Sequence, residues 1–217
     1  MDLSAPATPR RPSRSNGVER YQMLTAAAKR LMEKVGSEAV TIKAIAEEAG
    51  VPMASVYHFF PTPKAACVAV SETYLAEIAE LIGRSVPKRS ADDVNAFIVV
   101  LMRRMVNWYR RNPTAMKLML GSDYRWNIRL ADLENNRGMA ASIASRIARR
   151  FALCEDGRHA RILNTAISIG DAVWSLSMAE DGAITPYYAG EAERAVTAYL
   201  DTALAPGGAA GQLEDRK

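Results

Sequence analysis

Five neighbouring side chains combine hydrogen-bonding groups with small or flexible apolar ones: Met53, Ala54, Ser55, Tyr57 and His58. Hydroxyl and imidazole groups donate and accept hydrogen bonds at the edges of base pairs, and apolar groups can contact the methyl group of thymine. Such side chains reach the bases of duplex DNA only from a support that fits the major groove, which is about 12 Å wide. The surrounding sequence therefore has to form a short helix that is held firmly from behind.

The stretch from Thr41 to Phe60 predicts such a helix as the second of a pair joined by a tight turn. Before the turn, apolar residues recur at helical spacing, at Ile42, Ile45, Ala46 and Ala49. Thr41 can cap this first helix, and Gly50 can end it in a left-handed conformation. Pro52 suits the first position of the second helix, because its missing N–H is not needed there.

The second helix, over residues 52–59, is too short to be stable alone in water. We expect Val56 and Phe60 to anchor it, which leaves the five side chains above facing outward. A short helix held at an angle by a Gly turn is typical of the helix-turn-helix. An ordinary corner between two helices of a helical protein has the same local pattern.

A longer string of residues separates these two interpretations. It comprises Thr41, Ile45-Ala46, Ala49-Gly50-Val51, Val56-Tyr57-His58-Phe59-Phe60, Thr62-Pro63 and Lys64. In this order it closely resembles the DNA-binding module of TetR-family transcription regulators, over about residues 17 to 66. Two positions depart from the family pattern. Pro52 replaces a helix-capping Ser that is common there, and Pro63 stands where the family often has a phosphate-contacting Lys, with Lys64 one residue later.

The candidate phosphate contacts are Thr41, Lys43 and Lys64, whose hydroxyl and ammonium groups suit phosphate oxygens. A solvated surface lysine is the alternative interpretation of Lys43. Residues 1–64 hold nine basic and six acidic residues, a net charge of +3, and the remainder holds 19 and 18, a net charge of +1. The small excess of +4 thus lies mainly where contact with phosphates needs it.

Composition argues against several other classes of protein. The 217 residues are 49% hydrophobic and 24% charged, as in globular domains, and no apolar run is long enough to span a membrane. Without an apolar signal segment at the start, we expect a cytoplasmic protein. The two cysteines, Cys67 and Cys154, form no CxxC motif, and His58 and His159 are the only histidines. We therefore expect no metal site and no cofactor.

An enzyme would need a nucleophile with a base, paired carboxylates or a metal cluster. The sequence contains no G-x-S-x-G motif, no Gly-rich phosphate loop and no metal-ligand spacing. We therefore expect no enzymatic activity.

Helical periodicity without sustained alternation of apolar and polar residues predicts an all-α fold. The expected parts are a disordered basic arm over residues 1–15, a three-helix helix-turn-helix DNA-binding domain over 16–64, a larger C-terminal helical domain for regulation, ligand binding and dimerisation over 65–205, and a flexible tail over 206–217. The arm contains Arg10, Arg11 and Arg14, which can supplement contacts to DNA. A solvated tail accounts for the same composition.

Capping residues and apolar stripes place the individual helices. The first runs from about Val18 to Val35 behind a capping box of Asn16 and Glu19. The fourth begins at Pro63, with Thr62 as its cap, and stops at Gly83. The remaining helices are a long one that ends before Pro113 and others over residues 115–120, 126–151, 158–178 and 187–204.

The last two helices indicate pairing with a second copy of the chain. The helix over 158–178 is apolar on more than one face, with Leu163, Ile167 and Trp174 on one side and Ile162, Ile169, Ala172 and Leu176 on another. The helix over 187–204 has an apolar seam of Ala192, Ala195, Val196, Tyr199, Leu200 and Ala203. The resemblance implies that these two helices form a four-helix interface in a homodimer. The core of a monomer is the alternative interpretation.

A set of methionine and aromatic residues in the C-terminal part is a candidate ligand pocket. It comprises Met102, Met105, Trp108, Tyr109, Met116, Met119, Tyr124, Trp126, Trp174 and Met178. Methionine adapts to varied ligands, and aromatic residues with polar groups can orient them. Asp171 and Glu180 would add a carboxylate for a cationic ligand. Solid core packing is the alternative interpretation of this set.

These features predict a dimeric regulator that binds a palindromic DNA operator with two recognition helices about 34–36 Å apart. The resemblance implies a repressor that a small apolar or aromatic inducer releases from this operator. A ligand-independent DNA-binding or interaction module is the alternative, and in that case the methionine and aromatic set is solid core.

Overall fold

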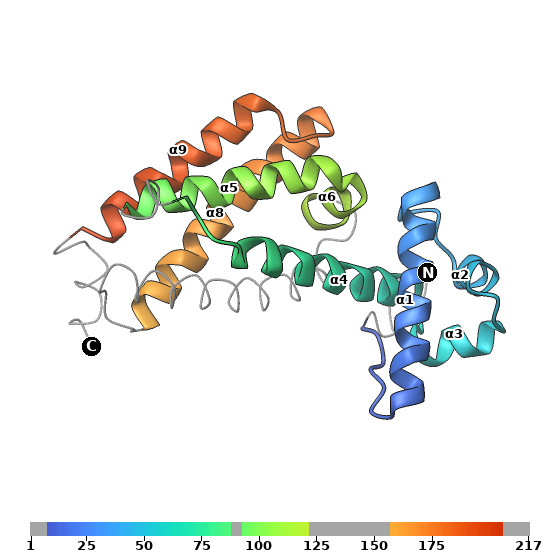
Figure 1. Cartoon of the computed structure of the whole chain (residues 1–217). Coiled ribbons are helices and arrows are strands. Elements are labelled where there is room, and N and C mark those ends of the chain that lie inside the picture. Colours follow the sequence, from blue (N-terminus) through green and yellow to red (C-terminus); the bar gives the residue numbers. More distant parts are fainter. Residues whose placement is uncertain (1–7, 88–92, 122–156, 206–217) are drawn as a thin grey trace, which may run out of the picture. The chain divides into compact units, whose positions relative to one another are not determined.

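Helices account for all regular secondary structure in residues 8–87, 93–121 and 157–205, which are the residues described by this computed structural model (Figure 1). In order they are α1 (Ser15–Val35), α2 (Ile42–Ala49), α3 (Met53–Phe59), α4 (Pro63–Gly83), α5 (Val94–Arg111), α6 (Pro113–Leu120), α8 (Gly157–Asp181) and α9 (Pro186–Ala203). The predicted all-α fold is confirmed. The helix expected over residues 126–151 lies outside the described residues.

The chain forms two compact units that divide within α4. The first contains α1 to α3, α4 as far as Glu77, and α6; the second contains the rest of α4, α5, α8 and α9. The sequence pattern placed a boundary earlier, at residue 64. The beginning of α4 belongs to the first unit because residues 65–71 are all buried, as in a helix that is covered on every side.

Local capping sets the turn between α2 and α3 as the sequence predicted. The Thr41 hydroxyl accepts a hydrogen bond from the Ala44 amide at 3.1 Å, so it caps α2. Gly50 ends α2 in the left-handed region, with φ 66° and ψ 37°. Pro52 is the N-cap of α3, so this helix begins one residue later than expected. At the far end, the Thr62 hydroxyl accepts from the Ala65 amide at 3.2 Å and caps α4.

Helix α1 begins earlier than its sequence pattern indicated. The carbonyl of Arg14 accepts a hydrogen bond from the Val18 amide at 3.0 Å, and the helix starts at Ser15. The predicted capping box of Asn16 and Glu19 is therefore wrong, because both residues lie inside the helix. The buried face consists of Leu24, Thr25, Ala27, Ala28 and Met32. Val35 is 53% exposed because it is the last residue of the helix.

Charged side chains join α1 to α2. The two carboxylate oxygens of Glu48 accept hydrogen bonds from Arg30 Nε at 3.0 Å and from Lys34 Nζ at 2.9 Å. These two donors hold the pKa of the Glu48 carboxyl below its usual range. Arg30 and Lys34 lie four residues apart and therefore on one side of α1, so both reach the same carboxylate.

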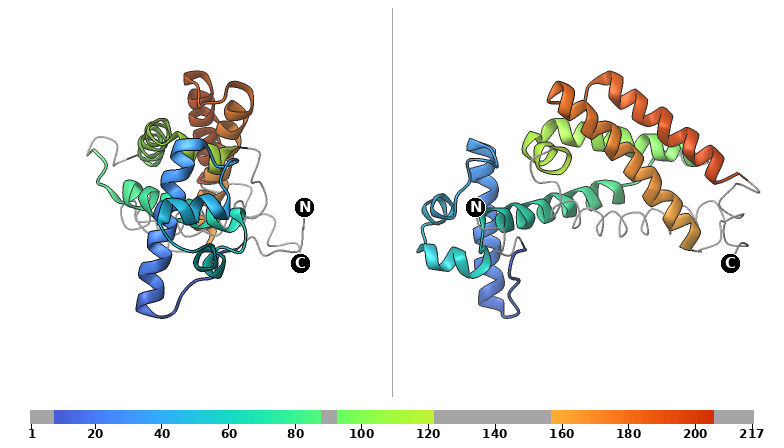
Figure 2. Two further views of the ribbon diagram at one scale, coloured as in Figure 1. Left: turned by 90° about the vertical axis from the view of Figure 1, so that its right-hand side faces the viewer. Right: turned by 180° about the vertical axis from the view of Figure 1, so that it is seen from behind.

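In the second unit, α9 packs against both α8 and α5 (Figures 1 and 2). The turn from α8 to α9 is closed by Ser177, whose buried hydroxyl donates to the Ala183 carbonyl at 2.7 Å and accepts from the Thr185 amide at 3.0 Å. Arg103 on α5 makes two hydrogen bonds of 2.9 Å to the Glu193 carboxylate on α9. Among the described residues, no helix combines the length and apolar character that crossing a membrane requires.

Substitution of Gly50 by Ala tests the left-handed end of α2. No atom lies within 4 Å of an added Cβ, so the only cost is the strained backbone, about 1 kcal/mol of the free energy of unfolding. The measurement is urea denaturation followed by circular dichroism. Gly83→Ala is the matched control: its Cβ also meets open space, but its φ is not positive, so the variant should be as stable as the parent or slightly more. Equal losses in both variants would contradict this explanation.

Glu48→Gln tests the charged contacts between α1 and α2. Because the folded-state pKa of Glu48 is lowered, its ionised form stabilises the fold above the usual pKa of 4.5, and this contribution disappears as the pH falls through the folded-state value. The variant should be less stable than the parent at pH 7, and the difference should vanish in acid. Glu47→Gln is the control, since Glu47 has only an exposed contact of 3.8 Å with Lys43. A difference that persists unchanged below pH 3 would refute the assignment.

Candidate nucleic-acid interface

The outer face of α3 presents the five side chains that the sequence suggested for reading bases. Met53 is 46% exposed and Tyr57 is 49% exposed, and Ala54 and His58 are exposed as well. Ser55 is half-buried at the edge of this group. The structure thus brings the five side chains onto one short helix, while their contact with DNA stays a prediction.

Three buried side chains hold α3 from behind. Val56 and Phe60 are buried, as predicted, and so is Phe59. The ring of Tyr21 on α1 meets Phe59 and Phe60 edge-on, with ring centroids 5.9 Å and 5.4 Å apart. The sequence argument missed Phe59 as an anchor, although its position three residues after Val56 puts both on one face of the helix.

The three candidate phosphate contacts surround α3 on neighbouring helix ends. Thr41 is exposed at the start of α2, where its hydroxyl oxygen is engaged as the cap. The side chain of Lys43 is 74% exposed, and its ammonium lies 3.8 Å from Glu47, a contact that solvent largely screens. Lys64 is exposed in the first turn of α4 and has no ion-pair partner among the residues that the structure describes. Both lysines can therefore approach an external anion.

An open hollow of about 730 Å³ lies beside the turn between α2 and α3. It is lined by Lys43, Ala46, Glu47, Gly50, Val51, Pro52 and Met53. Glu47 puts a negative charge in this lining, and the sequence argument did not consider it. A carboxylate here repels phosphate, so Glu47 offsets part of the attraction from Lys43.

The described members of the methionine and aromatic set lie in both compact units. Met102, Tyr109 and Trp174 are buried in the second unit, where the Tyr109 ring lies edge-on to Trp108 and Trp174 at 5.4 Å and 6.1 Å. Met105, Trp108 and Met178 are half-buried there. On α6, in the first unit, Met116 is buried and Met119 is half-buried. Tyr124 and Trp126 lie outside the described residues. Three hollows between described residues are lined by other side chains, and the ligand role of this set stays a prediction.

The polar groups near this set differ in their availability to a ligand. The indole N–H of Trp174 is buried and has no hydrogen-bond partner in the described part of the chain. Asp171 is buried on the same helix. Glu180 is exposed and accepts a hydrogen bond from the Tyr188 hydroxyl, so it is engaged at the surface. Of the two carboxylates considered for a cationic ligand, only Asp171 is therefore buried within the unit that holds most of the set.

Within the described residues, no three His, Cys, Asp or Glu side chains are grouped as metal ligation requires. Cys67 is buried in α4, and Cys154 lies outside the described residues. His58 is exposed on α3, and His159 is half-buried on α8. The histidines thus lie on different helices, in different compact units.

Comparison with solved structures supports the fold. A TetR-family transcriptional regulator from Streptomyces coelicolor is 20% identical, with 84% of this chain and 95% of that chain covered and a TM-score of 0.61. Thermus thermophilus FadR, a TetR-family transcriptional repressor solved with lauroyl-CoA, is 18% identical, with 83% and 93% covered and a TM-score of 0.63. SmeT, the repressor of the Stenotrophomonas maltophilia multidrug efflux pump SmeDEF, is 18% identical, with 85% and 88% covered and a TM-score of 0.53. A comparison with curated protein sequences found no match.

Two family comparisons cover most of the described chain. Residues 24–69, which include the helix-turn-helix, match the bacterial regulatory proteins of the tetR family. Residues 92–204, just over half of the chain, match the tetracyclin repressor-like C-terminal domain. The resemblance carried by the residues from Thr41 to Lys64 is confirmed, and the chain belongs to the TetR family of transcription regulators.

Proposed function

We propose that the protein is a homodimeric transcription regulator that binds a palindromic operator and is released from it by a small apolar or aromatic ligand. It acts as a repressor in the cytoplasm, where its DNA target lies. The observation that carries this proposal is the construction of α3: three buried anchors on one face, and four exposed side chains with the half-buried Ser55 on the other.

Sequence recognition is assigned to the outer face of α3 and phosphate binding to its neighbours. Ser55, Tyr57 and His58 supply hydrogen bonds to base edges, and Met53 and Ala54 supply apolar contacts to thymine methyl groups. Thr41, Lys43 and Lys64 hold the phosphates that fix the register of α3 in the major groove. Lys64 is aided by its position in the first turn of α4, where the helix dipole favours an anion.

Dimerisation is assigned to α8 and α9. On α8, Ile162, Leu163 and Trp174 are buried within the unit, while Leu176 on another side is 47% exposed. On α9, the buried positions are Ala192, Val196 and Leu200, and the half-buried ones are Ala195, Tyr199 and Ala203. The first row of α9 is thus used within the chain, and the second row, with the exposed side of α8, is the surface that remains for a second copy. Two copies supply the two recognition helices that a palindrome requires.

Ligand response is assigned to the methionine and aromatic set of the second unit. The buried Trp174 N–H has no hydrogen-bond partner among the described residues, which is unfavourable in a dry interior and would be relieved by a ligand that accepts a hydrogen bond. The FadR structure shows a protein of this fold with lauroyl-CoA bound, which supports an apolar ligand here. Helix α4 belongs to both units, so a ligand that favours one of its positions would change the affinity for DNA.

A ligand-independent DNA-binding module is the second candidate, because solid packing of Met102, Tyr109 and Trp174 accounts for their burial equally well. A ligand that binds only the folded state must raise the melting temperature. A broad screen of apolar and aromatic compounds without any such rise would favour this second candidate over an inducible repressor.

Replacement of Tyr57 and His58 by Ala tests the base contacts. Each lost contact should cost about 1–3 kcal/mol of discrimination, so the double variant should bind its operator at least about tenfold more weakly. Its affinity for unrelated duplexes should change little, because the phosphate contacts remain. The measurement is fluorescence anisotropy with operator DNA selected from the region upstream of the coding sequence or from random duplexes. Unchanged operator binding would contradict the assignment.

Lys43→Ala tests the phosphate contacts and complements the base-contact variant. The affinity of the dimer for every duplex should fall by a similar factor, and the slope of log affinity against log salt should decrease by about 1.8, about 0.9 for each of the two copies. Glu47→Gln is the matched control: it removes the neighbouring negative charge and should strengthen binding to every duplex. Loss of operator binding alone after Lys43→Ala would assign Lys43 to the bases instead.

Leu176→Glu tests the dimer surface. A charge on this exposed position leaves the chain folded but is unfavourable in an apolar interface, so analytical ultracentrifugation should show monomers at micromolar concentration. Operator affinity should fall and depend more steeply on protein concentration. Asn107→Glu, at an exposed position of α5, is the control and should remain dimeric. A dimer of unchanged stability in the Leu176 variant would place the interface elsewhere.

A further inference from the structure

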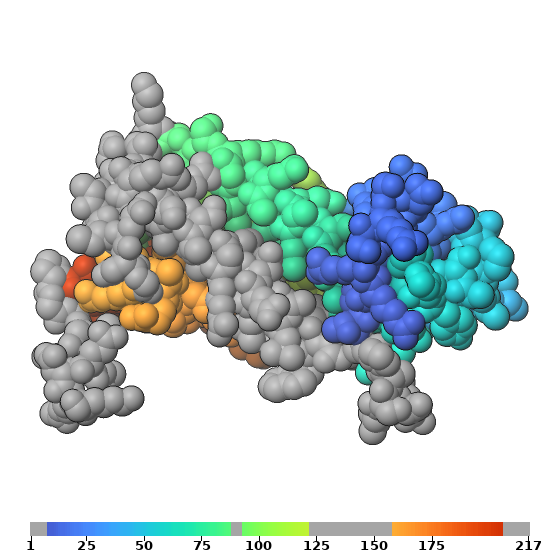
Figure 3. Space-filling view, turned by 90° about the horizontal axis from the view of Figure 1, so that it is seen from below, coloured from blue at the N-terminus to red at the C-terminus, as the bar shows by residue number. Residues whose placement is uncertain are grey.

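The described part of the N-terminal arm is docked on the DNA-binding unit. Residues 9–14, called here the N-terminal strap, contact three helices. The Arg10 amide donates to the Phe59 carbonyl at the end of α3 at 2.8 Å, and Arg11 Nη2 donates to Glu72 Oε1 on α4 at 2.6 Å. Figure 3 shows the blue residues of the N-terminal segment and α1 beside the cyan residues of α3. This docking differs from the disordered arm that the composition favours.

Gly17 provides the third contact, on α1. A Cβ built on Gly17 would lie 2.8 Å from Pro12 Cβ, closer than such atoms approach, so the strap lies against the bare backbone of α1. Gly17 is inside a helix and does not have a positive φ, so its conformation does not call for glycine. The close approach of Pro12 is therefore the structural reason for glycine at this position.

The sequence of the strap lowers the entropic cost of docking it. Pro9 and Pro12 fix two backbone angles, and Pro12 also restricts Arg11 to extended conformations. A segment that is already extended loses little freedom when it binds. The pair of Arg11 and Glu72 alone contributes little, because the Arg11 side chain is mostly exposed. The three contacts together hold the strap.

The strap meets α3 where that helix needs support. The last carbonyls of a helix have no partner within it, and the Arg10 amide satisfies the carbonyl of Phe59, the last residue of α3. The ring of Tyr21 packs on Phe59 and Phe60, and its hydroxyl is buried. Burial is the main reason that the pKa of Tyr21 is raised to about 12, with smaller and opposite effects of Glu72 and Arg11. The strap's ion pair thus lies near the aromatic anchor of α3.

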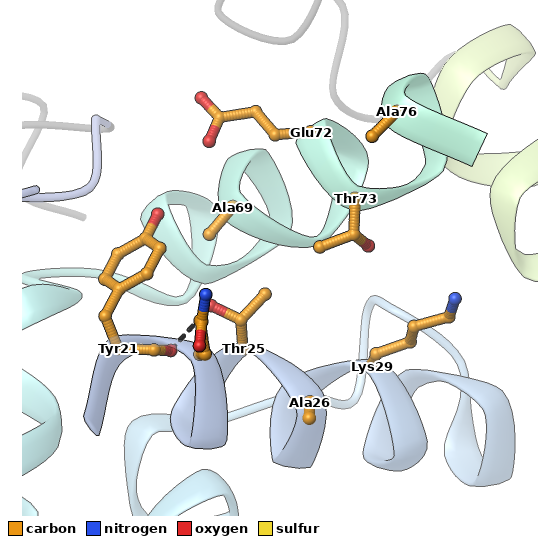
Figure 4. A pocket seen from close by; sticks show the side chains of 9 residues that line it. Tyr21, Thr25, Ala26, Lys29, Ala69, Glu72, Thr73 and Ala76 are labelled. Atoms are coloured by element: carbon orange, nitrogen blue, oxygen red, sulfur yellow. Dashed lines mark hydrogen bonds between the residues drawn. The ribbon is translucent and has the colours of Figure 1, made fainter. Parts of the chain in front are cut away.

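Packing between α1 and α4 leaves room for such a brace. A hollow of about 370 Å³, lined mainly by small side chains, lies between the two helices (Figure 4). Tyr21 and Lys29 lie at opposite ends of its α1 wall, and Ala69, Thr73 and Ala76 line the α4 wall. Beyond the Lys29 end, Lys29 pairs with Glu77 at 2.7 Å. At the Tyr21 end, the corresponding ion pair is the one between Arg11 of the strap and Glu72 on α4.

We propose that the N-terminal strap positions the recognition helix α3 for DNA, with Arg11 acting on Glu72 as a positioning residue. This inference rests on the proposed DNA-binding function. In the alternative, Arg11 is a phosphate contact that Glu72 holds only in the absence of DNA. The two roles predict opposite effects of removing the Glu72 charge. If the pair of Arg11 and Glu72 supports α3, the change weakens operator binding. If Arg11 is a phosphate contact, the change releases Arg11 and strengthens operator binding.

The test is a comparison of the full-length parent with Arg11→Gln, Glu72→Gln and the double variant. Fluorescence anisotropy measures their affinities for operator and for unrelated duplexes at several salt concentrations. Both single variants should bind the operator about two- to fivefold more weakly, and the double variant should bind no more weakly than either. The salt slope should stay unchanged. Glu77→Gln is the matched control, since it removes the same charge from α4 and one ion pair with α1 but leaves the strap intact.

Two outcomes of these titrations would overturn the proposal. The first is operator binding by Glu72→Gln that equals or exceeds that of Glu77→Gln, which rules out a supporting role of the ion pair. The second is a salt slope reduced by about 1.8 in Arg11→Gln, about 0.9 for each copy in the dimer, which makes Arg11 a phosphate contact. Hydrogen exchange of the Arg10 amide in DNA-free protein gives a separate readout. This exchange should be slow in the parent. It should be fast in Gly17→Ala, because the added Cβ displaces Pro12, while alanine is a good helix former and leaves α1 intact. A fast-exchanging Arg10 amide in the parent also overturns the proposal. Failure of the parent to prefer any operator would instead reject the proposed function.

Discussion

Burial of three side chains behind a seven-residue helix is the constraint on which the rest of the first unit depends. A helix as short as α3 does not persist in water through its own hydrogen bonds, so Val56, Phe59 and Phe60 must supply its stability from the core. The ring of Tyr21 on α1 lies edge-on to Phe59 and Phe60 and covers part of them. Only with this support can the opposite face of α3 present the side chains that we assign to contact with bases.

Helix α4 is a second element on which the structure depends, because it belongs to both compact units. Residues 65–71 in its first turns are all buried. Further along, the Tyr74 hydroxyl donates to Glu33, and Lys29 lies over the Tyr74 ring at 4.3 Å. These contacts link α1 to the middle of α4. A displacement of α4 would therefore be transmitted to the recognition helix through these polar contacts with α1 as well as through the buried core.

Local chemistry explains which features the sequence was able to predict. The caps at Thr41 and Thr62, the left-handed Gly50 and the anchors Val56 and Phe60 depend on residues a few positions away, and all were predicted correctly. The docking of the strap joins residues 10 and 59 and residues 11 and 72, and a composition rich in Pro, Ser and Arg does not encode such distant partners. The same limit applies to Tyr109 and Trp174, whose contact is visible only after α5 and α8 have packed.

The hydrogen bond between the Arg10 amide and the Phe59 carbonyl has a practical consequence for preparing the protein. A tag fused in front of Met1 would be joined to Arg10, which is bonded to the end of α3, by only nine residues. An affinity tag at that end would bring its own charges, often several histidines, close to the surface assigned to DNA and would alter measured affinities. A cleavable leader that is removed before assays avoids this effect.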